Sequence, residues 1–156
     1  MGALMDLVAG DAAAILTAIS IDDLAAFTDR TRFAAHLSLG PGLDPTWLDR
    51  FSEAARSVTG TGEPVDFLDA RRELNGPEDV AGRTIERVDP RWAEAIARLS
   101  DHDVLAVAGR WLDLLDEEYG VLPREEKPWI RELAGEVVGF CRAAERAPDI
   151  IFAWSL

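Results

Sequence analysis

Ile150-Ile-Phe-Ala-Trp154, an apolar run near the end of the chain, decides the fold class of this sequence. The run is short and resembles a β-strand, although it could equally be an irregular tail laid across a core. A strand needs a partner, and no β-hairpin pattern elsewhere in the chain supplies one. The sequence therefore predicts an all-α fold, in which this run is a short extended apolar segment at the C-terminal end.

Helical periodicity covers most of the chain before that run. Trp47, Phe51 and Ala55 recur at the spacing of one helical face, and Val104, Ala108 and Trp111 do the same. We predict a compact orthogonal or irregular bundle of about six to seven helices. The predicted helices cover residues 12–19, 20–37 with a break near 28–31, 45–58, 90–99, 101–119 and 128–147.

Helix boundaries are marked by residues with capping chemistry. Asp11 and Ser100 each precede a periodic segment, where a side-chain oxygen can accept hydrogen bonds from the free amides of the first turn. Gly120 follows the helix predicted over 101–119, at a position where a positive φ angle is easiest for glycine. Pro148 ends the last predicted helix.

The length of 156 residues favours one domain over residues 1–156. The segment Asn75-Gly-Pro-Glu-Asp-Val-Ala-Gly-Arg83 is the best candidate for a seam between subdomains, near residues 75–84. Two independent domains are disfavoured, because each would have fewer than about 80 residues and a small core.

Composition excludes several classes of protein. The chain has 29 acidic and 16 basic residues, a net charge of −13, which disfavours nucleic acid and anionic membranes as partners. An apolar content of 48% excludes a wholly disordered acidic polymer. The first residues make a poor signal peptide and Cys141 is the only cysteine, so we expect a cytoplasmic location. Because Lys127 is the only lysine beside many Arg and Ala residues, the composition is typical of a bacterial GC-rich genome.

Catalytic and cofactor motifs are mostly missing. Thr59-Gly-Thr-Gly62 is the nearest to a phosphate loop, but it follows a helix, and a flexible connection explains it better. His36 and His102 are candidates for a polar or metal site only if they meet in space with carboxylates. We predict no cofactor, no metal and no catalytic residue. An enzyme is disfavoured but not excluded, because active sites also assemble from residues that are distant in sequence.

Two further residue types favour structural roles over functional ones. Cys141 lies on the apolar face of the last helix, as a core residue would. Most of the five Trp residues lie on apolar helix faces and are expected in the core, although a cluster of them could line a pocket for a flat or apolar ligand.

The acidic residues of one stretch of the sequence are not explained by helix capping. Acidic side chains at a helix C-terminus oppose the helix dipole, so they cost stability unless Arg residues compensate. A solvated surface tolerates that cost, and the alternative is a docking patch for a basic protein. The possible partner-binding residues are Asp113, Asp116, Glu117, Glu118, Tyr119, Glu125, Glu126 and Trp129.

Three functions compete. The first is a non-catalytic protein of inhibitor, immunity or adaptor type that binds a basic protein. The second is a small-molecule-binding protein or enzyme with a Trp-lined pocket in the helical core. The third, a DNA mimic, is disfavoured because acid is spread over both halves of the chain with Arg interleaved. The sequence favours the first and does not indicate an oligomeric state.

Overall fold

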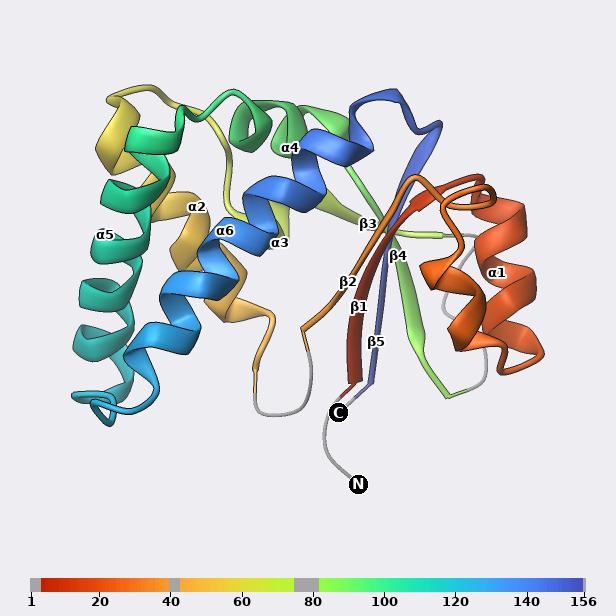
Figure 1. The fold of residues 1–156 in the computed structure, drawn as a ribbon, viewed down its shortest axis with the longest axis horizontal. Helices are drawn as coiled ribbons and strands as arrows, with labels where there is room; N and C mark the ends of the chain where they lie inside the picture. Colours follow the sequence, from red (N-terminus) through yellow and green to blue (C-terminus); the bar gives the residue numbers. More distant parts are fainter. Residues whose placement is uncertain (1–3, 40–42, 75–81, 156) are drawn as a thin grey trace. The chain divides into compact units, whose positions relative to one another are not determined.

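A computed structural model describes residues 4–39, 43–74 and 82–155 and shows a mixed α/β fold (Figure 1). It contains a five-stranded antiparallel sheet with the strand order β2-β1-β5-β4-β3. The predicted all-α bundle is therefore wrong. The elements in chain order are β1 (Leu4–Gly10), α1 (Ala12–Ser20), the 3-10 helix η1 (Leu24–Thr28), β2 (Ala35–Ser38), α2 (Thr46–Thr59), α3 (Phe67–Ala70), β3 (Arg71–Glu73), β4 (Thr84–Val88), α4 (Pro90–Ala97), α5 (Asp101–Tyr119), α6 (Lys127–Ala143), the 3-10 helix η2 (Ala144–Arg146) and β5 (Asp149–Ser155).

The C-terminal run that decided the prediction is β5, the central strand of the sheet. It pairs on one side with β1, where Leu7 faces Phe152, and on the other side with β4, where Ile85 faces Ala153. Its main partner thus lies at the opposite end of the sequence. A hairpin pattern detects only strands that are close in sequence, so it could not reveal this pairing.

The described chain forms two compact units, each made from separate stretches of sequence. The sheet unit comprises residues 1–43, 71–90 and 143–156, and the helical unit comprises residues 44–70 and 91–142. The seam predicted near residues 75–84 falls largely on 75–81, outside the described residues. The single-domain assignment stays a prediction.

One face of the sheet is covered by α1 and η1 (Figure 1). Apolar side chains from the strands and from these two short helices share one core there. This core contains Val8, Ile15, Ala18, Ile19, Phe27, Phe33, Ile85, Ile151 and Ala153. Asp11 begins α1 as predicted, because its side chain accepts a hydrogen bond from the Ala14 amide at 3.0 Å.

The two central strands are buried on both faces. Val8 and Ile151 belong to the core under α1, while Leu7 and Phe152, which point the opposite way, are also buried. A strand buried on both faces reads as a continuous apolar run without polar alternation. This explains why the sequence of β1 carries no period of two.

Residues 35–37 were predicted as the end of a helix over 20–37, and this is wrong. The segment contains the short helix η1 followed by β2, which pairs with β1 and places His36 opposite Val8. Tertiary pairing decided the conformation, because Ala35–Ser38 completes the backbone hydrogen bonds of β1.

The helical unit is built around α2 and α5, which pack against each other. Buried indole groups hold it together: Trp92 donates a hydrogen bond to Ser52 and Trp111 donates one to the Trp47 carbonyl, both at 2.9 Å. The helix predicted over 101–119 is confirmed as α5, with Ser100 as its N-cap and Gly120 following it at φ +84°.

Candidate functional site

The predicted partner-binding residues lie in the helical unit, at and around the turn that joins α5 to α6 (Figure 1). The first five residues of the set belong to the second half of α5, Glu125 and Glu126 precede α6, and Trp129 lies in its first turn. The fold therefore keeps the predicted residues near one helix junction.

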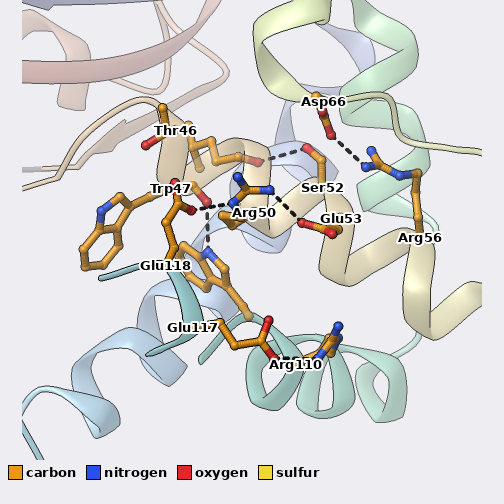
Figure 2. A network of polar contacts seen from close by, with 12 residues as sticks. Thr46, Trp47, Arg50, Ser52, Glu53, Arg56, Asp66, Arg110, Glu117 and Glu118 are labelled. Carbon is orange, nitrogen blue, oxygen red and sulfur yellow. Dashed lines mark hydrogen bonds and ion pairs between the residues drawn. The ribbon is translucent and has the colours of Figure 1, made fainter. Parts of the chain in front are cut away.

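Half of the acidic side chains at this junction are neutralised within the helical unit. Figure 2 shows Glu118 beside Arg50 of α2, at 2.5 Å, and Glu117 beside Arg110, at 3.9 Å. Asp116 pairs with Lys127 at 3.5 Å and accepts a hydrogen bond from the Leu122 amide. These cations offset the unfavourable interaction of the acids with the C-terminal end of the α5 dipole.

Arg50 links α2 to α5 through two carboxylates. Its guanidinium group lies between Glu118 and Glu53, which is 2.9 Å away on the same helix (Figure 2). Hydrogen bonds to Glu118 and then to Glu53 raise the pKa of Arg50. Glu118 is therefore part of the packing of the unit, and its carboxylate is already engaged.

The other acidic side chains remain exposed. Asp113, Glu125 and Glu126 form no ion pair with any described residue. Tyr119 and Trp129, beside them in the sequence, have 45% and 44% of their surface exposed. A single exposed ring is ordinary, but several exposed large side chains at one place mark a candidate interaction surface, and both of these rings lie at the α5–α6 junction.

Val121 belongs with these residues and was missed from the sequence. It is 82% exposed, in the turn between α5 and α6. A single Val in a turn gives no pattern that distinguishes exposure from burial. We call the set Asp113, Tyr119, Val121, Glu125, Glu126 and Trp129 the α5–α6 surface.

His36 takes part in a buried charged cluster that the sequence did not reveal. Its Nε2 lies 2.7 Å from Oδ1 of Asp6, and Arg83 donates a hydrogen bond to the other carboxylate oxygen at 2.6 Å. The side chains of Asp6 and Arg83 are only 10% and 6% exposed. These residues come from β2, β1 and the residue before β4, so only the sheet brings them together.

The cluster gives Asp6 an unusual titration. Burial would raise the pKa of Asp6, but hydrogen bonds from His36 and Arg83, with their charges, outweigh burial and lower it below the ordinary value. A depressed pKa in the folded state means that ionised Asp6 stabilises the fold above its unfolded pKa of about 3.9, and this stability is lost as the pH falls through the folded pKa.

We therefore expect the stability difference between the wild type and Asp6→Asn to be largest near neutral pH and to shrink below about pH 4. Urea unfolding of both proteins between pH 7 and pH 2.5 measures it. The comparison isolates Asp6 from the other carboxylates, because both proteins carry those. A difference that stays constant over the whole range would contradict the assignment.

A second charged group lies on the sheet. Glu86 of β4 accepts hydrogen bonds from Arg71 of β3 at 3.0 Å and from the Trp154 indole of β5 at 2.5 Å. Trp154, the last residue of the C-terminal apolar run, is thus part of the sheet. The group ties three adjacent strands together through side chains.

The remaining residues that the sequence singled out, His102 and Cys141, belong to the helical unit and not to the sheet unit of His36. His102 is exposed in the first turn of α5, in the helical unit, whereas His36 is in the sheet unit. Within the described residues, no three His, Cys, Asp or Glu side chains are arranged to hold a metal ion. Cys141 is buried in α6, and desolvation raises the pKa of its thiol.

The helical unit contains a cavity of about 310 Å³. It lies between the end of α2, the loop that follows, the end of α4 and the start of α5, and the Thr59-Gly-Thr-Gly62 segment borders it. The lining residues are Ala55, Thr59, Thr61, Glu63, Pro64, Ala95, Arg98, Leu99 and Asp103. None of them is a Trp, so this is not the predicted Trp-lined pocket, which stays a prediction.

Comparison of the chain with known protein families, curated proteins and solved structures found no match. Among the described residues, no helix combines the length and the apolar character needed to cross a bilayer.

Proposed function

We propose that the protein binds a basic protein partner through the α5–α6 surface, without catalysis, as an inhibitor, immunity protein or adaptor does. The observation that carries this proposal is the exposure of Trp129, Tyr119 and Val121 beside three carboxylates that no described cation neutralises. Large aromatic side chains are enriched in protein interfaces and supply much of their binding energy.

Charge supports a basic partner. Asp113, Glu125 and Glu126 are three of the 29 acidic residues that give the chain its net charge of −13. A field of this sign attracts a basic surface, increases its rate of association and repels nucleic acid and anionic lipid. Because the exposed rings and the unpaired acids lie around the same helix junction, a partner that covers this junction would bury the former while its cations meet the latter.

The cytoplasm is the location we propose for this interaction. The single cysteine is buried as a free thiol, which suits a reducing compartment. A basic protein with which it would associate is expected in the same compartment.

We expect the purified protein to retain a basic protein from a bacterial extract at low salt, and we expect Trp129→Ala to weaken that complex by at least about tenfold. The retained protein is purified and its Kd and association rate are measured at about 50 and 300 mM salt. Glu125→Gln/Glu126→Gln should slow association at low salt. These two charges attract the basic partner over a distance, before the two surfaces touch.

Matched controls come from exposed residues outside this surface. Leu105→Ala removes a side chain that is 75% exposed in the first half of α5, and Glu94→Gln/Glu145→Gln removes two exposed acids. Both controls should bind like the wild type. Retention of no protein, or equal affinity of Trp129→Ala and the wild type for the retained protein, would refute the proposal.

A further inference from the structure

The cavity of the helical unit joins an apolar wall to charged side chains of both signs. Ala55 of α2, Ala95 of α4, Leu99 and Pro64 provide the apolar part, and its volume of about 310 Å³ is in the range of small-molecule sites. A cavity that combines such a wall with charged side chains accepts the apolar body of a ligand and orients it through its charges.

The charged side chains around the cavity do not neutralise one another. Arg98, the residue after α4, uses its Nε to donate to the Glu94 carbonyl of that helix, and its Nη groups have no partner among the described residues. The carboxylates of Glu63 and Asp103 likewise form no ion pair with described residues. One cation and two anions therefore border the same space, each with its hydrogen-bonding capacity available.

We propose that this cavity binds a small zwitterion with an apolar side chain, that is, a free α-amino acid. Its carboxylate would pair with the planar guanidinium of Arg98, which suits bidentate recognition of a carboxylate. Its ammonium group would lie between Glu63 and Asp103, and its side chain would cover Ala55, Ala95 and Leu99. A simple anion would be repelled by the two acids and a simple cation by Arg98, whereas a zwitterion places a group of opposite charge next to each of these three side chains.

The probes for this site are L-leucine, N-acetyl-L-leucine, which lacks the ammonium charge, and L-leucinamide, which lacks the carboxylate. Amide chemical shifts of the full-length ¹⁵N-labelled protein are followed by NMR during each titration. We expect L-leucine to shift the amides of Thr59, Thr61 and Leu99 and to saturate below about 10 mM. Each of the other two probes should bind at least about tenfold more weakly, since each leaves charged groups of the cavity unpaired.

Variants assign the roles of the charges. Arg98→Gln should weaken L-leucine binding about tenfold and remove the preference over L-leucinamide, while Glu63→Gln/Asp103→Asn should remove the preference over N-acetyl-L-leucine. Arg131→Gln, an exposed Arg of α6, is the matched control and should bind like the wild type. The proposal is overturned if L-leucine shifts none of the cavity amides, if all three probes bind equally, or if Arg98→Gln binds like the wild type.

Discussion

Asp6→Ala is expected to lower the free energy of unfolding by about 3–5 kcal/mol, because it removes one partner of a buried ion pair. Asp6 accepts hydrogen bonds from Arg83 at 2.6 Å and from His36 at 2.7 Å. Without that carboxylate, the guanidinium group of Arg83 would stay buried and uncompensated next to the apolar core under α1. Urea unfolding followed by circular dichroism at pH 7 measures the loss.

Two further proteins separate the charge effect from packing. Asp6→Leu/Arg83→Met replaces both charges by apolar side chains, and it should recover much of the lost stability, because the uncompensated guanidinium group of Arg83 is removed together with Asp6, although His36 still loses its carboxylate partner. Asp113→Ala removes an exposed acid and should change the free energy of unfolding by less than about 0.5 kcal/mol. If Asp6→Ala and Asp113→Ala cost the same, the cluster does not stabilise the sheet unit.

Trp111→Ala is expected to destabilise the protein by about 3–5 kcal/mol. Trp111 is fully buried in the helical unit, where its ring packs edge-on against Phe51 at 5.1 Å and against Trp47 at 6.5 Å. The substitution leaves a large cavity between α2 and α5 and deprives the Trp47 carbonyl of its indole donor. The midpoint and slope of urea unfolding measure the effect.

Comparison with other substitutions of Trp separates volume from hydrogen bonding. Trp111→Phe keeps most of the ring and loses the donor, so a smaller cost of about 1–3 kcal/mol is expected. Trp129→Ala, at a half-exposed ring, should change stability by less than about 0.5 kcal/mol while it weakens the proposed binding by at least about tenfold. Equal destabilisation by Trp111→Ala and Trp129→Ala would contradict the assigned core.

Most helices could be predicted because their evidence is local. The helix predicted over 101–119 matches α5, since apolar residues three and four apart, Ser100 at one end and Gly120 at the other all lie within one stretch of sequence. The four-residue helix Phe67–Ala70 was missed, because it is too short for periodicity to be read.

The sheet could not be predicted, because the evidence for its strand pairing is not local in the sequence. Its central pairing joins β1 to β5, so each of these strands depends on residues at the other end of the chain. β1 is buried on both faces, so its sequence shows no alternation of apolar and polar residues. β2 was predicted as part of a helix, because the sequence near it contains no strand with which it could pair.

The candidate site also has a part that local sequence predicts and a part that only the fold determines. The acidic and aromatic residues at the α5–α6 junction were recognisable because they are neighbours in the sequence, but the ion pairs that Asp116, Glu117 and Glu118 form were not. The structure shows that Arg50, far away on α2, engages Glu118, whereas Glu125 and Glu126 stay unpaired with described residues. Which acids are available for a partner is therefore a property of the fold.

Local sequence alone determines where this chain forms its helices and where acid and aromatic residues accumulate, because helical hydrogen bonds and caps join residues no more than about four positions apart. Tertiary structure decides the sheet, the Asp6–His36–Arg83 cluster and the cavity beside Arg98. Strand pairing, buried ion pairs and cavity walls join residues that are distant in sequence, and no local pattern records those contacts.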